Sequence, residues 1–200
     1  NADVVVEAAV IGSAGITIDA ADSITFTEAG DLTGSGNIAI TANTDNAAGN
    51  GGNVISMADV SSANQTEINA GGGTITLTNT GTSGGNVTIG KLTTTNTGTT
   101  AVTITTAGDV MDADSDASND VTTGAGGRLV IVATGSIGDV NPLEMDVGQM
   151  DVATSGGAAE LIDIDNTSGA ALGIIKLETV GANIEVDHDH DLTITASGSG

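Results

Sequence analysis

The sequence predicts an all-β fold, a parallel β-helix (β-solenoid) of roughly eight coils of short strands. Apolar and polar residues alternate in short runs along the whole chain, and Gly, Asn, Thr and Ser, which suit turns, separate the runs. Each run is too short to bury its apolar face alone. We therefore expect each run to stack on its equivalent in the next coil, which pairs the backbone and continues the core.

Residues 73–90 show the repeating unit most clearly. Two short arms alternate Thr with aliphatic residues, which are Ile75, Leu77, Val87 and Ile89. Strict alternation with β-branched residues is typical of a strand, because successive side chains point to opposite faces. The polar residues between the arms predict a turn.

The same unit occurs in order through the first half of the chain. Residues 2–11 are the most apolar run, and they predict a strand buried on both faces or a lead-in from a preceding repeat. Residues 43–53 are polar and predict a loop. The expected strands carry the pairs Ile16 and Ile18, Ile24 and Phe26, and Ile38 and Ile40, followed by residues 54–60 and the two arms above.

The second half continues the pattern after an acidic interruption at residues 112–123. Pro142 marks a turn or the start of a strand. The expected strands carry Val102 and Ile104, residues 129–132, Met145 and Val147, Met150 and Val152, Leu161 and Ile164, Ile174 and Leu177, Ile184 and Val186, and Leu192 and Ile194.

Composition limits the fold and the partners. Phe26 is the one aromatic residue of Phe, Trp and Tyr type among 200, so the core must consist of Val, Ile, Leu, Ala and Met, which suits a narrow interior. A net charge of −23 argues against nucleic acid and anionic membranes as partners. The sequence contains no run of about 18 apolar residues, so we expect no insertion into a membrane. Disorder and an antiparallel sandwich are the rival structures, the first suggested by charge and the second by the many short strands.

The pattern resembles the β-solenoid repeats of filamentous-haemagglutinin-like adhesins, which are giant bacterial surface proteins. The residues that carry the resemblance are 15–20, 36–42, 134–139 and 141–148, with the glycine-rich phrases at 156–157 and 166–169 after them. The resemblance implies a right-handed parallel β-helix that is exported to the cell surface as part of an extended fibre, and it supplies no catalytic residues.

The acidic interruption is the first candidate site. Asp112, Asp114, Asp116 and Asp120 alternate with small residues, and carboxylates in such a loop can converge on calcium. The EF-hand pattern fails, because Ala117 stands where that loop needs Gly and Thr123 replaces the closing Glu. The alternative is a solvated acidic loop.

His188 and His190 are the second candidate site, as two ligands of a transition metal on one side of an extended chain. No third ligand is visible in the sequence. Continued strand alternation would place both rings in the core at a high cost, so we expect a turn with the histidines exposed.

An enzyme that degrades polysaccharides is a further alternative, because Asp163 and Asp165, and likewise Asp187 and Asp189, alternate as paired carboxylates. The chain has no Trp or Tyr to stack on sugar rings and only three Lys and Arg residues, so we expect no enzymatic activity.

These observations together predict one β-solenoid segment over residues 1–200, as one repeat of a longer chain or fibre. We expect a structural or adhesive role in an extracellular surface filament, sheath or adhesin, without a cofactor other than calcium. Its expected partners are the adjacent repeat or another copy, head to tail, and glycans or proteins of a cell surface. The alternative function is a calcium-dependent matrix or adhesion module.

Overall fold

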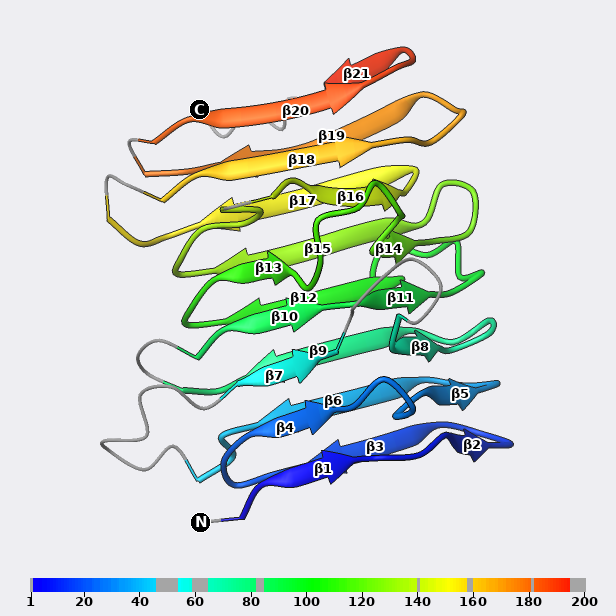
Figure 1. Ribbon diagram of the computed structural model, residues 1–200. Helices are drawn as coiled ribbons and strands as arrows, with labels where there is room; N and C mark the ends of the chain where they lie inside the picture. The colour runs from blue at the N-terminus through cyan, green and yellow to red at the C-terminus, as the bar shows by residue number, and fades with distance from the viewer. Residues whose placement is uncertain are drawn as a thin grey trace.

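The computed structural model describes residues 2–45, 54–58, 65–81, 85–139, 141–157, 160–180 and 182–194. Its strands stack as a parallel β-solenoid of about seven turns, which confirms the predicted fold class (Figure 1). The described residues contain no helix, and so no helix that is long and apolar enough to cross a membrane. The predicted loop at 43–53 falls largely outside the described residues.

The strands form three sheets in which every neighbouring pair is parallel. The first sheet contains β1 (Val4–Val6), β4 (Ile24–Phe26), β7 (Ile55–Met57), β10 (Val87–Ile89) and β13 (Val110–Asp112). The second contains β2 (Val10–Gly12), β5 (Leu32–Gly34), β8 (Glu67–Asn69), β11 (Lys91–Thr93), β14 (Val121–Thr122), β16 (Leu143–Asp146), β18 (Ile162–Asn166) and β20 (Ile184–His188). The third contains β3 (Ile16–Asp19), β6 (Ile38–Ala42), β9 (Ile75–Asn79), β12 (Val102–Thr106), β15 (Arg128–Ala133), β17 (Gln149–Thr154), β19 (Leu172–Glu178) and β21 (Leu192–Ile194).

Each of the first five coils takes one strand from each sheet in turn. In Figure 1 the first and second sheets lie in front, the third lies behind, and the chain climbs from N to C in a right-handed sense. This handedness is the usual one for parallel crossovers. In the upper coils Ile137 forms isolated bridges with Val110 of β13 below it and with Ile162 of β18 above it. Because β18 also pairs with β16, this one strand continues both the first and the second sheet.

The core consists of ladders in which aliphatic side chains stack from coil to coil. One ladder of the third sheet contains Ile16, Ile38, Ile75, Val102, Leu129, Met150, Ile174 and Ile194. Its neighbour contains Ile18, Ile40, Leu77, Ile104, Ile131, Val152 and Leu177. Ladder members in the inner coils are fully buried, and each such side chain contributes about 1.5–3 kcal/mol of transfer free energy.

The first coil differs from the strand predicted at residues 2–11. The run divides into β1 and β2, and Val5 and Ile11 are exposed rather than buried on both faces. The physical reason is that each strand packs only one face against the core, so the alternate side chains point to solvent.

Candidate functional site

The acidic loop after β13 is curled by its own carboxylates. Asp112 Oδ1 accepts a hydrogen bond from the backbone N–H of Asp114, at 3.0 Å. Asp114 Oδ1 accepts the N–H of Asp116, and Asp116 Oδ1 accepts that of Ser118, at 2.8 and 2.6 Å. Each is the local bond of an Asx-turn, in which a side chain replaces a backbone acceptor two residues before the donor.

The structure brings two of the four predicted loop aspartates together with a glutamate from the next coil. Asp112, Asp120 and Glu144, here called the carboxylate triad, offer oxygens that all lie within 4.8 Å of one another. Asp112 ends β13, Asp120 precedes β14, and Glu144 lies on β16. Within the described ranges this is the one cluster of three such ligands, and Asp114 and Asp116 are not part of it.

Hydrogen bonds hold two members of the triad and leave one oxygen of the third without a partner. Asn141 Nδ2 donates to Asp112 Oδ2 at 2.7 Å, and the Glu144 backbone N–H donates to Asp120 Oδ2 at 3.0 Å. Asp120 is 1% exposed and Glu144 6% exposed. Glu144 Oε2 is buried with no hydrogen-bond partner among the described residues.

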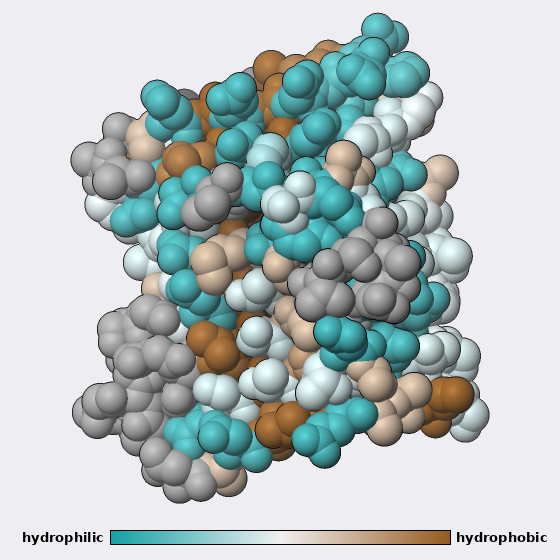
Figure 2. Space-filling model, viewed as in Figure 1, coloured by the Kyte–Doolittle hydropathy of each residue, from teal (hydrophilic) through white to brown (hydrophobic). Residues whose placement is uncertain are grey.

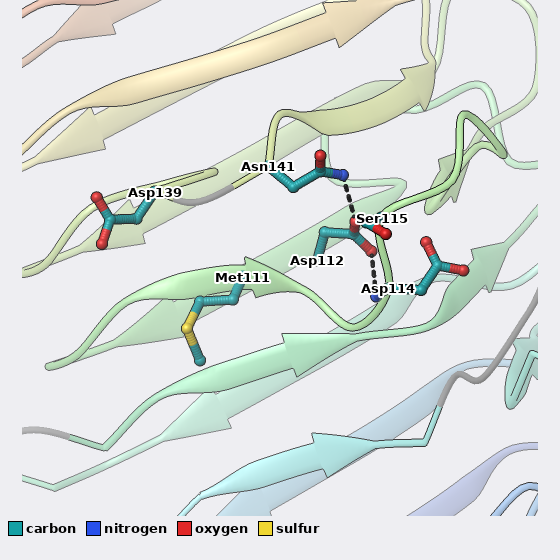
Figure 3. Close-up of a pocket in the computed structure, with 6 residues that line it drawn as sticks. All are labelled: Met111, Asp112, Asp114, Ser115, Asp139 and Asn141. Carbon is teal, nitrogen blue, oxygen red and sulfur yellow. Dashed lines mark hydrogen bonds between the residues drawn. The ribbon is translucent and has the colours of Figure 1, made fainter.

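A hollow opens beside Asp112, one member of the triad. It has a volume of about 210 Å³, and Figure 3 shows Asp112 inside it with hydrogen bonds to Asn141 and Asp114. Met111 and Asp139 lie on its other side, so the hollow reaches Asp112 between two successive coils.

Burial raises the pKa of every carboxyl in the triad, and the charge of a nearby carboxylate raises each of them further. Burial is the largest cause in each case. The charge of Asp112 further raises the pKa of Asp120 and of Glu144, the latter to about 7. Burial and neighbouring negative charge both favour the neutral form of a carboxyl, because its charged form is poorly compensated there.

None of the three Lys and Arg residues compensates the triad. Lys91 lies 3.9 Å from Glu67, and Lys176 lies 2.8 Å from Glu178. The Arg128 guanidinium donates to the Gln149 side chain. The triad therefore has no ion pair within the part of the chain that the structure describes.

Two members of the triad, Asp120 and Glu144, belong to a longer column of charged residues on the outward side of the second sheet. The register stacks Asp120, Glu144, Asp165 and Asp187 on four consecutive coils above Lys91. Like charges in adjacent strands destabilise a sheet. After burial, the charges of Asp187 and Asp189 raise the pKa of Asp165.

The paired aspartates considered for an enzyme belong to this same acidic surface. Asp163 pairs with Glu185, and Asp165 with Asp187, in β18 and β20. Burial, followed by the charges of Glu185 and Asp165, raises the pKa of Asp163. The structure thus sets carboxylates against carboxylates here, without a cationic group among their hydrogen-bond or ion-pair partners in the described residues.

Of the two histidines, His188 differs from the predicted exposed turn, whereas His190 is exposed in a bend as expected. His188 ends β20 and is half-buried, whereas His190 is exposed, and their ring centres are 6.1 Å apart. His188 Nδ1 lies 2.8 Å from the carbonyl oxygen of Asn166 in the coil below. This contact keeps His188 in the strand, and the described residues bring no third metal ligand to the pair.

Sequence reasoning missed Glu144, which is 24 residues from Asp120. The signal in the sequence is a charged residue between the two buried residues Leu143 and Met145. Only the stacking of coils places it above the acidic loop.

No family model, curated protein or solved structure matches this chain. The structure supports the resemblance to filamentous-haemagglutinin-like adhesins at the level of a β-solenoid built from repeated coils. Membership of that family stays a proposal.

Proposed function

We propose that this chain is a structural β-solenoid segment of an exported surface filament, sheath or adhesin, and that its end coils stack head to tail. The observation that supports the proposal is that the core ladders continue to both end coils and lose their cover there. Leu192 and Ile194 of β21 are 48% and 69% exposed, although their partners Leu172 and Ile174 in β19 are buried.

The opposite end repeats this feature. Val10 of β2 is 42% exposed, whereas Leu32, its partner in β5, is fully buried. Among the described strands, β3 and β21 close the third sheet with unpaired outer edges. An unpaired strand edge beside exposed aliphatic side chains is a template for another strand, and native proteins normally cover such an edge.

The two ends differ in sequence but share the parallel strand direction, so one end can continue the ladders of the other. Such a heterologous contact propagates a filament when rotation does not close a ring. The covering coil can come from the adjacent repeat of the same chain or from another copy. The side of the solenoid in Figure 2 is largely hydrophilic, with hydrophobic spots scattered over it.

The sides of the solenoid suit an extracellular surface role. Outward positions of the third sheet carry Thr in successive coils, as at Thr76 and Thr103, and the whole chain carries a charge of −23. A hydrophilic acidic surface keeps a long fibre soluble and leaves its sides available to glycans or proteins of a cell surface. We expect no catalytic activity, and a panel of polysaccharides left unchanged by the protein would support that expectation.

Light scattering across a concentration series, with negative-stain images, tests the proposal. We expect end-to-end particles that lengthen with concentration. Ile194→Lys places a charge in the end contact and is expected to weaken association at least about tenfold. Thr105→Lys, at an exposed position in the middle of the third sheet, is the matched control and leaves association unchanged. A short monomer at every concentration would contradict the proposal.

A further inference from the structure

The carboxylate triad contains one buried carboxylate oxygen that has no hydrogen-bond partner among the described residues. Glu144 is 6% exposed, and its Oε2 atom is buried with no hydrogen-bond partner in the described residues. Burying such an oxygen without a partner is costly, and the cost rises when the group is charged. Glu144 nevertheless lies beside two further carboxylates. A cation bound between the three carboxylates would give this oxygen the partner that the described residues do not supply.

The spacing of the three carboxylates fits one hard cation. Their ligand oxygens lie within 4.8 Å of one another. Calcium binds oxygen at about 2.3–2.6 Å, so two ligands on opposite sides of the ion are separated by at most about 5 Å. Magnesium binds oxygen at about 2.0–2.1 Å in a nearly ideal octahedron and usually keeps several waters with one or two carboxylates, so three protein carboxylates at one site suit calcium better. The ligands are all oxygens, as calcium prefers.

We propose that Asp112, Asp120 and Glu144 bind one calcium ion, which joins the acidic loop of one coil to β16 of the next. Asp112 and Asp120 stand at the two ends of the loop, and Glu144 comes from the coil above. One ion bound to all three therefore closes the loop at its base and links two coils. The hollow that Asp112 lines leaves room for water ligands on the Asp112 side of the ion.

Neighbouring groups are arranged to orient the ligands rather than to replace the cation. The Asn141 amide donates to one oxygen of Asp112, and the Glu144 backbone N–H donates to one oxygen of Asp120. Each of these bonds leaves lone pairs for the ion, since a carboxylate accepts about four hydrogen bonds. Such supporting bonds fix ligand orientation at metal sites. This site is independent of the proposed stacking of end coils.

Isothermal titration of the whole chain with calcium chloride, after removal of bound ions by a chelator, tests the proposal. We expect one saturable site per chain and a higher melting temperature with calcium. Glu144→Gln keeps the side-chain shape and removes the charge, and it is expected to weaken binding at least about tenfold. Asp19→Asn, which makes the same charge change on exposed β3, is the matched control and binds as the unaltered chain does.

Several results would overturn the assignment. One is the absence of saturable binding at millimolar calcium, and another is equal binding by Glu144→Gln and Asp19→Asn. Equal affinity for magnesium and calcium would refute the choice of ion. If Glu144→Gln fails to fold by circular dichroism, Asp112→Asn at a half-buried position makes the same test. Light scattering with a chelator separates the two proposals, because end-to-end stacking is expected to continue without calcium.

Discussion

The ladder that contains Ile104 offers the sharpest test of how the solenoid is stabilised. Ile104 is fully buried between Leu77 in the coil below and Ile131 in the coil above. Ile104→Ala removes three carbon atoms, which lowers the transfer free energy by about 2.4 kcal/mol at about 0.8 kcal/mol for each. The cavity adds to this cost, because stacked coils on both sides limit collapse. We expect a loss of about 3–4 kcal/mol in the free energy of unfolding.

Ile194 provides a control with the same residue type and the same substitution. It lies in the neighbouring ladder but is 69% exposed, so Ile194→Ala should cost less than about 1 kcal/mol. Urea unfolding followed by far-ultraviolet circular dichroism is the suitable assay, because the chain has no Trp or Tyr for fluorescence. Equal losses for the two variants, with unchanged dependence on urea concentration, would refute the view that stacked burial stabilises the fold.

Two further predictions concern the upper coils. Gly138 has a φ of 69° and lies against the Asp163 carbonyl oxygen. Gly138→Ala should therefore lower the free energy of unfolding, measured with urea, by about 2–3 kcal/mol. A change within experimental error would show that the turn adapts to the added methyl group. Burial, with the charges of Glu185 and Asp165, raises the pKa of Asp163 in the folded state above its ordinary value of 3.8. The folded protein therefore binds this proton more tightly than the unfolded chain does. Its stability falls as the pH rises from 3.8 through the raised pKa. Asp163→Asn should therefore reduce the fall in melting temperature over that window, and an identical pH profile would contradict the cause assigned to the shift.

Most of the ladder residues could be predicted from alternation alone. Ile75 and Leu77 are both buried with Thr on the other face, because a strand shows its side chains to alternate sides. What alternation cannot give is which residue lies above which. Ile38 pairs with Ile75, 37 residues on, whereas Val102 pairs with Leu129, 27 residues on. Loops of unequal length hide this register in the sequence.

The candidate site was predictable only in part, because the register between coils is not visible in the sequence. Asp112 and Asp120 belong to one acidic segment that local composition reveals. Glu144 joins them only through the pairing of Val121 with Met145, which no local pattern encodes. Asp114 and Asp116 turn instead to backbone N–H groups two residues away, because an Asx-turn forms within the loop itself.

Successive coils stack in parallel and in register, and a series of distances between spin labels tests this stacking most directly. The chain has no native Cys, so labels can be attached to introduced cysteines alone. The outward positions Thr17, Val130 and Lys176 lie in one column of the third sheet, with Val130 four coils and Lys176 six coils above Thr17.

Pulsed electron spin resonance on the labelled pairs should give about 19 Å between positions 17 and 130 and about 29 Å between positions 17 and 176. Both values assume a rise of about 4.8 Å for each coil, and the label arms broaden both distance distributions. A separation that grows in proportion to the number of coils is the predicted result. Similar distances for the two pairs, or a shorter distance for the second pair, would contradict the stacked β-solenoid.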